Sequence, residues 1–571
     1  MAEISSFNLW DKKWIYVLDL NCQMKLVSLF ELFRDSNNYK SLAGETETQN
    51  AAILRFLLAI LHTVFSHMDE KGHDNPITVR NARSRWKTLW DMGEFPTTPI
   101  INYCNLWKNR FDILSPDFPF YQVPETIAEE EKYTKLEVSK LNGEIIESNN
   151  QSKLFLLRSG NNKKQMTIDE GSRWLIYLQS YDDRGKLSIN HDIGWLGHLG
   201  LIYAVGNNLF ETLMLNLIFL RDGIMEWGEC KPTWENEVIK LSTDKENCKI
   251  TFPDNPAELY TMQSRRLKLH INSDGLIDYF YSKGGDYFSS GDITESFVSL
   301  GEQMTLFTTN KTDKQINIFP KRHDKSVQIW REFSSIIAQL DKDDENKISS
   351  PGIVKWIAMI QPIIGRNRYV HFRTVGIEYK KPFYSVITQI FSDTLDIHSK
   401  LFEESSKKDR KDIIQEIKRI EEIANTAIIH LSDNLNFSLG IEDNRDSPSD
   451  NKNSGYKKII SDQKKWTEYF FFKIDIPFRL WLQEYIPQKE KGNIMEIFQY
   501  WRNQSRKIAL SVCNDMICQA GKTSTVGHKY QNIDKIKNFQ IRAVREKWYS
   551  AAECQEDFFT DLKLVERKFV L

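Results

Sequence analysis

Three histidines are each followed directly by an aspartate, and such pairs can hold a divalent metal ion in phosphohydrolases. The pairs are His73-Asp74, His191-Asp192 and His323-Asp324. A metal site of this kind also needs further histidines and a carboxylate at helical spacing. His62 and His67 stand five positions apart, so they do not share a helix face, and no HExxH motif occurs. Because the motif is incomplete, we predict that the three pairs lie on unrelated turns. The alternative function is a metal-dependent phosphohydrolase or nuclease that uses these pairs.

Two glycine-containing segments resemble parts of phosphate-binding motifs. Gly521-Lys522-Thr523 has the end of a P-loop, but Met516 stands where that motif needs its first glycine, and a helix precedes it instead of a strand. The segment 194–200 lacks the GxGxxG order of a dinucleotide site. Gly521 is therefore predicted to end a helix, and the glycines of the second segment to allow a tight turn or close packing. No Ser–His–Asp or Cys–His signature was found, so we predict no catalytic residue, no metal ligand and no cofactor, and a protein that is not an enzyme.

Composition limits how this chain can act. Its 571 residues suit two or three domains. It has 76 basic and 78 acidic residues, a net charge of −2, so any contact with nucleic acid must use local basic patches or more basic partners. Seven cysteines without a CxxC pair argue against a disulfide framework. The start lacks a signal peptide, and the apolar stretch Ala51–Phe65 is too short to span a bilayer. We therefore expect a cytoplasmic protein without a membrane partner.

The first two thirds of the chain mix helices and strands irregularly. The patterns predict a strand at Trp14–Leu18, a capping box from Ser28 to Glu31, and a long helix from about Thr46. Further strands are predicted within Leu259–Ile271 and Tyr369–Glu378. The charged segment Glu125–Asn150 is predicted to be a mobile loop.

Beyond about Leu395 the sequence predicts helices and no strand. The first of four helical stretches has an apolar seam of Ile413, Ile417, Ile420, Ala424, Ala427 and Leu431. The fourth is predicted to run from about Ile533 to Phe559. The fold class is therefore α+β: a large mixed N-terminal domain over residues 1–394, followed by a C-terminal four-helix bundle over residues 395–571.

Several segments, in this order along nearly the whole chain, resemble those of the CasA family. They are Phe7–Asp11, Trp14–Val17, Leu42–Gly44, Phe118–Gln122, Arg173–Leu175, Gly194–Leu217, Pro232–Glu235, Glu258–Thr261 and Val375–Tyr379. That family supplies the large subunit of the type I-E CRISPR Cascade complex, which serves antiviral defence. The resemblance implies crRNA and the other Cascade subunits as partners. It also implies recognition of the protospacer-adjacent motif (PAM) in double-stranded target DNA, help in opening that duplex, and recruitment of a helicase–nuclease that does the cutting.

The resemblance also implies which residues read DNA. A loop that also approaches the crRNA 5′ end corresponds to Phe155, Arg158 and Gly160, and a glycine loop near the DNA backbone corresponds to Gly185 and Lys186. A lysine finger in the minor groove matches Lys283, followed by Gly284. The element that parts the strands corresponds to Lys380, Lys381 and Pro382. Minor-groove contacts of this kind suit permissive motif reading.

A basic run within the bundle is a second candidate DNA surface. Basic residues strongly outnumber acidic ones between Gly521 and Ser550. The candidates for contact with the DNA backbone are Lys529, Lys535, Lys537, Arg542 and Arg545. Such an excess can bind phosphates, or it can be an ordinary solvated helix face. A purely structural scaffold within a ribonucleoprotein is a further alternative function.

Overall fold

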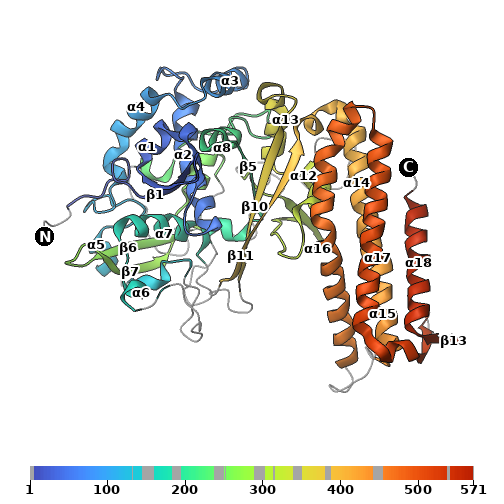
Figure 1. Ribbon diagram of the computed structural model, residues 1–571. Helices are drawn as coiled ribbons and strands as arrows, with labels where there is room; N and C mark the ends of the chain where they lie inside the picture. Colours follow the sequence, from blue (N-terminus) through green and yellow to red (C-terminus); the bar gives the residue numbers. More distant parts are fainter. Residues whose placement is uncertain are drawn as a thin grey trace. The chain divides into compact units, whose positions relative to one another are not determined.

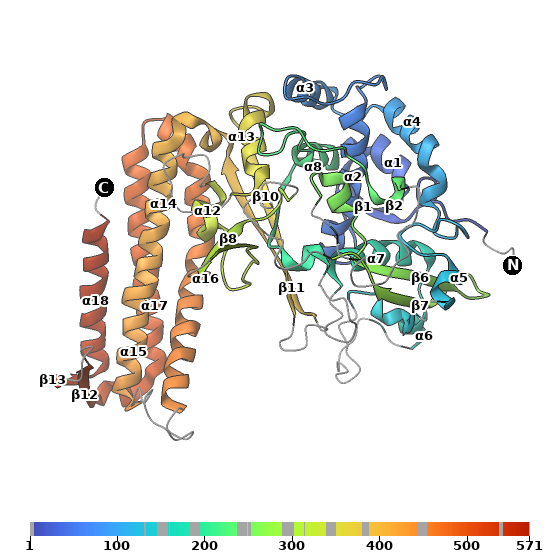
Figure 2. The same ribbon diagram turned by 180° about the vertical axis from the view of Figure 1, so that it is seen from behind.

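The computed structural model divides the protein into two compact units. The N-terminal unit comprises Met1–Ile329 with Ser334–Leu395, and the C-terminal unit comprises Trp330–Phe333 with Asp396–Leu571. Figures 1 and 2 show the mixed first unit and the helical second unit. The structure describes every residue except 1–4, 131–132, 145–157, 159, 183–193, 237–247, 249, 251–252, 288–301, 313–314, 338–349, 380–386, 442–453, 536–540 and 570–571.

The N-terminal unit is built from short strands and helices around one central helix. Its strands are β1 (Ile15–Asp19), β2 (Met24–Val27), β3 (Tyr39–Leu42), β4 (Thr134–Glu137), β5 (Leu201–Val205), β6 (Arg265–Ile271), β7 (Ile277–Gly284), β8 (Phe307–Thr312), β9 (Gln315–Pro320), β10 (Tyr369–Tyr379) and β11 (Ile387–His398). Its helices are α1 (Leu29–Arg34), α2 (Glu47–His67), α3 (Ala82–Met92), α4 (Thr97–Trp107), α5 (Glu125–Glu130), α6 (Asn161–Lys164), α7 (Ile168–Tyr181), α8 (Leu209–Asn216), α10 (Pro256–Tyr260), α12 (Phe333–Ile337) and α13 (Gly352–Ile364).

Helix α2 is the core of this unit. It begins as predicted at Thr46, whose side chain accepts a hydrogen bond from the Gln49 amide. Every residue from Ala51 to Phe65 is buried, rather than one face alone, because α4, α7, α8, α10 and β10 all pack against the helix. By length and composition α2 could cross a membrane, but 83% of its most apolar stretch is buried inside the protein. The predicted capping box is also confirmed, at the start of α1.

Three small antiparallel sheets surround this core. Their strand orders are β2-β1-β3, β4-β7-β6 and β11-β10-β5. The second sheet lies along α7: at one end Met166 and Ile277 exchange backbone hydrogen bonds, and at the other end Ser264 and Arg265 bond to Gln179. Strand β10 pairs with β5 from His371↔Val205 to Val375↔Leu201.

Two predictions for this unit were wrong in part. The segment predicted as a mobile loop, Glu125–Asn150, contains α5 and the edge strand β4, which pairs with β7. The first residues of the predicted strand Leu259–Ile271 end α10 instead. That helix starts at Pro256 with its cap on Asn255, and β6 begins only at Arg265. Proline at the first helical position is a helix-start signal that outweighs the β-propensity of the following residues.

The C-terminal unit contains four long helical runs that pack against one another. They are α14 (Lys407–Glu422) continuing through a π-helical turn (Ile423–Ile428) into α15 (Ile429–Ser438), then α16 (Ser454–Glu490), α17 (Ile494–Val526) and α18 (Ala551–Lys568). The predicted apolar seam of the first run is confirmed, because its six residues are all at most 3% exposed. Gly521 has a non-helical backbone with a φ of 74°, and two helical segments of α17 meet at a kink there, so a helix ends at Gly521 as predicted.

The prediction of no strand beyond Leu395 was wrong. Strands β12 (His528–Lys535) and β13 (Ile541–Tyr549) form an antiparallel hairpin, from His528↔Tyr549 to Lys535↔Ile541. The last helix consequently starts at Ala551 and not near Ile533. The capping box of Ser550 and Glu553 fixes where the helix begins.

Candidate nucleic-acid interface

The C-terminal end of α7 is the point where the roots of three predicted DNA-contacting segments meet. Residues Phe155, Gly185, Lys186, Lys380, Lys381, Pro382 and Lys537 lie outside the described residues. Asp182, Gly194 and Tyr379, which border the segments with Gly185, Lys186 and Lys380 to Pro382, are described, and their contacts place these borders.

The two flanks of the segment that contains Gly185 and Lys186 are held together. The backbone amide of Gly194 donates to the carbonyl of Asp182 at 3.0 Å. Gly194 packs so tightly on the end of α7 that an added Cβ would lie 2.5 Å from the carbonyl oxygen of Ser180. Only glycine allows this approach, so the glycine-rich segment serves close packing, as predicted.

Strand β7 carries Lys283 and Gly284 to the same place. In the sheet register Arg265 lies opposite Gly284, and Arg266 lies opposite Lys283. The guanidinium of Arg265 donates to the Asp182 carboxylate at 2.7 Å, and the two side chains are only 7% and 11% exposed. The amine of Lys283 is 5.5 Å from the centroid of the Tyr133 ring, and the residue is half-buried. Lys283 is thus held at a strand end and not on a free loop.

The third segment, which contains Lys380 to Pro382, joins β10 to β11. Tyr379 is the last residue of β10 and is 5% exposed. Its hydroxyl donates to the backbone carbonyl of Tyr181 at 2.7 Å, so the end of this strand is tied to the end of α7. Together with the Arg265–Asp182 pair, this contact brings residues from β6, β7 and β10 to one helix terminus.

We predict that Tyr379→Phe loosens this junction. Loss of the hydrogen bond leaves the Tyr181 carbonyl without this donor, and we expect a fall of about 1 kcal/mol in the free energy of unfolding. Urea unfolding of the whole chain measures the change. Tyr260→Phe is the matched control, because the hydroxyl of this buried tyrosine has no hydrogen-bond partner among the described residues. A loss in the control as large as that in Tyr379→Phe would contradict the prediction.

Arg158, from the fourth predicted segment, lies at the other end of α7. Its guanidinium pairs with Glu170 at 2.5 Å and with Glu144 at 3.6 Å. Burial raises the pKa of both carboxyl groups, while Arg158 opposes that rise. Glu170 is in the first turn of α7, about 18 Å along the helix from Asp182 at 1.5 Å per residue. Gly160 lies nearby in a turn with a φ of 59°.

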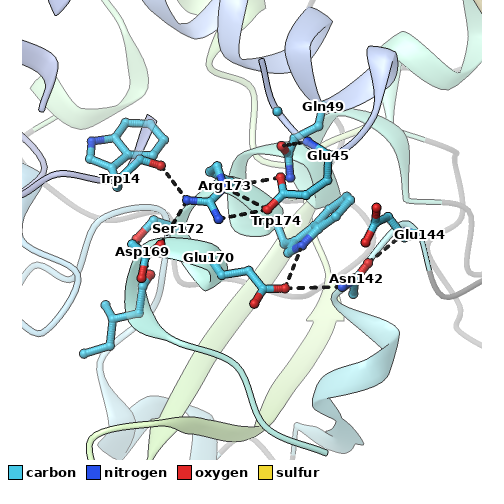
Figure 3. Close-up of polar contacts among 12 residues, drawn as sticks. Trp14, Glu45, Gln49, Asn142, Glu144, Asp169, Glu170, Ser172, Arg173 and Trp174 are labelled. Atoms are coloured by element: carbon cyan, nitrogen blue, oxygen red, sulfur yellow. Dashed lines mark hydrogen bonds and ion pairs between the residues drawn. The ribbon is translucent and has the colours of Figure 1, made fainter. Parts of the chain in front are cut away.

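A buried network supports this end of the helix (Figure 3). Arg173, with a side chain only 2% exposed, donates to Glu45 at 2.8 Å, to the Trp14 carbonyl at 2.7 Å and to Asp169 at 3.1 Å. The indole of Trp174 donates to Glu170 at 3.3 Å. Arg158 therefore joins a set of groups that already link α7 to the segment before α2, which makes its pair with Glu170 a structural anchor.

The second predicted DNA surface, the basic run between Gly521 and Ser550, lies largely on strands and not on a helix. Lys529, Lys535, Arg542 and Arg545 belong to the β12–β13 hairpin of the C-terminal unit, and Lys529 is exposed. A solvated helix face is therefore excluded for these residues, since they lie on strands. Lys547, near the end of β13, pairs with Asp557 of α18 at 2.5 Å.

The two His-Asp pairs that the structure describes have separate partners. His191-Asp192 lies outside the described residues. His73 pairs with Asp69 at 3.4 Å, whereas His323 lies against the Leu201 carbonyl at 3.0 Å. Within the part of the chain that the structure describes, no group of three or more His, Cys, Asp or Glu side chains could hold a metal ion.

Sequence reasoning missed the residues that hold the junction together. Gln179, Arg265 and Tyr379 were not given any role in the predicted site, although Tyr379 directly precedes the element predicted to part the strands. Tyr379 and Tyr181 are 198 positions apart, and no local pattern pairs such distant residues.

Comparison with known proteins gives one family over most of the chain. The family model described as CRISPR-associated protein Cse1 matches residues 8–512. A curated relative, the CRISPR-associated protein CasA/Cse1 of Thermus thermophilus, is 26% identical over 343 residues. That match spans 59% of this chain and 61% of the relative, which is less than two thirds of its length.

Solved structures share the fold. The crystal structure of Thermobifida fusca Cse1 has a TM-score of 0.75 and 21% sequence identity, covering 99% of this chain and 98% of that one. A chain of a CRISPR RNA-guided surveillance complex has a TM-score of 0.59 and 13% identity, covering 98% and 99% of the two chains.

Proposed function

The chain belongs to the CRISPR-associated Cse1 family, and from this premise we propose that it is the large subunit of a type I-E Cascade complex. In this role it reads the protospacer-adjacent motif in double-stranded DNA, aids opening of the duplex, and recruits the helicase–nuclease. Its partners are crRNA, the other Cascade subunits and the target DNA, and it works in the cytoplasm. We assign it no catalytic step, because the recruited nuclease does the cutting.

The observation that carries this proposal is the convergence at the end of α7. Three segments that the family resemblance assigns to DNA reading, far apart in the sequence, are rooted at Asp182 and Tyr181. A protein that delegates sequence reading to base pairing needs to recognise only a short motif and the shape of the duplex. A few segments whose flanking residues are held at one place suit that task, whereas a scaffold would not require these flanks to meet.

The two parts of the chain divide this work. We propose that residues 1–394 read the motif and contact the crRNA end, and that residues 395–571 contribute a further basic surface. Lys529, Lys535, Lys537, Arg542 and Arg545 on or beside the β12–β13 hairpin are the candidates for contacts with the DNA backbone. Such contacts bind without sequence preference and weaken as salt rises.

The first experiment measures target-duplex binding by the reconstituted crRNA complex, with and without this subunit, across a randomised flanking motif. We expect preference for a motif only when the subunit is present. If binding and motif choice are unchanged without it, recognition belongs elsewhere, and the structural scaffold becomes the better proposal. Cleavage of DNA by the isolated chain with a divalent metal would instead favour the phosphohydrolase.

A second test addresses Lys283. We predict that Lys283→Ala weakens binding of the preferred motif about tenfold, which is within the roughly 1–3 kcal/mol expected for loss of a base contact. Binding to duplexes without the motif should change much less. Lys87→Ala is the control, because Lys87 is an exposed lysine of the same unit that pairs with Asp91. An equal loss for every flanking sequence would make Lys283 a backbone contact and not a reader.

A further inference from the structure

A pocket borders the strand end that carries Lys283. It is a depression that is open to solvent, and the empty space of about 480 Å³ measured in it includes part of that solvent. One wall is the aromatic segment 118–122, a second is formed by residues 233, 234 and 236, and the third by Gln263, Arg266 and Asp286. Arg266 is the cross-strand partner of Lys283. The pocket therefore adjoins the end of β7, where the proposed motif reading takes place. The proposed function gives no role to the residues that line it.

Arg110 in this pocket is a cation without a counter-charge. Its guanidinium carbon lies 3.8 Å from the centroid of the Phe118 ring, and burial lowers the pKa of Arg110. It makes no hydrogen bond or ion pair with any described residue. A partly buried guanidinium in this state has lost hydration without gaining an acceptor, which is unfavourable unless an anion binds there.

Two further groups in the wall are incompletely satisfied. Arg266 is 1% exposed; it donates to Asp286 at 2.8 Å and to the Gln263 carbonyl at 3.0 Å, but its Nε has no partner among the described residues. The buried hydroxyl of Tyr121 also lacks one within that part of the chain. The backbone of Tyr121 has a φ of 54°, a strained conformation for a residue other than glycine. Strain of this kind gathers at binding sites.

The chemistry of the walls selects the ligand. Arg110 and Arg266 outweigh the single carboxylate of Asp286, so the pocket favours an anion. Phe118 and Trp234 add aromatic rings beside these cations. An arginine together with aromatic rings is the combination that holds unpaired nucleotides, through phosphate contact and base stacking.

We propose that this pocket binds one unpaired nucleotide, with its phosphate on Arg110 and its base against the aromatic wall. The inference rests on the proposed function, which brings nucleic acid to Lys283. The nucleotide comes either from the opened target DNA or from the crRNA, and these sources present the same phosphate and base. In this proposal Lys283 reads the motif at the end of β7, and the neighbouring pocket holds a nucleotide that is unpaired close by.

Photo-cross-linking of the reconstituted complex distinguishes the two sources. One arm carries 5-iodouracil in either DNA strand next to the motif, and the other carries 4-thiouridine in the crRNA. We expect cross-links at Phe118, Tyr121 or Trp234 in one arm, reduced at least fivefold by Arg110→Ala. Arg34→Ala is the matched control, since Arg34 also lies over a phenylalanine, Phe30 at 5.5 Å, but is bonded to Asp35.

A second measurement uses the full chain alone with 5′-phosphorylated RNA and DNA octamers, followed by fluorescence anisotropy. If neither cross-linking nor octamer binding depends on Arg110, the pocket proposal is overturned. Motif-dependent binding that persists in that case leaves the proposed function intact, so the two failures are distinguishable.

Arg110→Ala should also leave the denaturant midpoint unchanged or raise it, because an uncompensated cation is removed. A clear fall in the midpoint would assign Arg110 a structural role and overturn the proposal.

Discussion

Glu302→Gln is expected to lower the stability of the N-terminal unit by about 3 to 5 kcal/mol, because it leaves a buried cation without its counter-charge. Both carboxylate oxygens of Glu302 accept from Arg55 of the core helix α2, at 2.9 and 3.0 Å. The two side chains are 0% and 3% exposed. The indole of Trp195 and the amide of Met304 also donate to this carboxylate, at 2.7 and 2.9 Å. A glutamine of the same size cannot accept all these bonds.

The measurement is urea unfolding together with amide hydrogen exchange of α2, which reports on this unit separately. Exchange is needed because a protein of two units need not unfold in one step. Glu47→Gln is the matched control: it removes a glutamate charge from α2, the helix that carries Arg55, but the pair of Glu47 with Arg373 is 38% and 33% exposed. We expect about 1 kcal/mol or less from such a pair. Equal losses in both variants would show that burial does not decide the effect.

This ion pair also bears on the candidate site. Trp195 follows Gly194, the first described residue after 183–193, and Glu302 is the first described residue after 288–301. One carboxylate therefore fastens the ends of two long segments to the core helix. Neither Arg55 nor Glu302 could be singled out from the sequence, because they are 247 positions apart. In the sequence Arg55 is simply a charge that interrupts an apolar stretch.

Local patterns predicted those parts of the fold that local energetics decide. The capping box at Ser28, the helix start near Thr46 and the apolar seam from Ile413 to Leu431 depend on hydrogen bonds and spacing within a few residues, and all three predictions were confirmed. The β12–β13 hairpin was missed because a strongly charged strand resembles a solvated helix face. For the candidate site, resemblance supplied the segments, whereas the contacts that bring their roots together are long-range and had no local signature.

Charge was the least reliable guide to burial. The first helix of the C-terminal unit has charged residues at more than half of its positions, as in Lys407-Lys408-Asp409-Arg410-Lys411-Asp412, which is typical of a solvent-exposed surface. Arg410 is nevertheless 0% exposed, because its guanidinium donates to the carbonyls of Leu401 and Glu403. Glu416 and Arg419 are each 1% exposed beside the predicted apolar seam. The apolar positions were correctly predicted to be buried. The buried surface of this helix also includes charged residues next to them.

The last prediction follows from that buried charge. Glu416 accepts from Arg419 at 2.8 Å on one oxygen and from Arg502 of α17 at 2.5 and 2.9 Å on the other. Arg419 also donates to Ser505 at 2.7 Å, so this network joins the first helical run to α17. We expect Glu416→Gln to lower the free energy of unfolding of the C-terminal unit by about 3 to 5 kcal/mol, since Arg419 would stay buried without its counter-charge.

The matched control lies on the same helix. Glu422 pairs with Lys568 of α18 at 2.7 Å, but the two side chains are 34% and 61% exposed. Glu422→Gln should therefore cost less than about 1 kcal/mol, as followed by hydrogen exchange of α17 during urea unfolding. Replacing Glu416 and Arg419 together by apolar residues should recover most of the loss, because the uncompensated charge then disappears. If the double variant is as unstable as Glu416→Gln, packing and hydrogen bonding matter more than charge at this position. The uncompensated charge of Arg419 would then not be the cause of the loss.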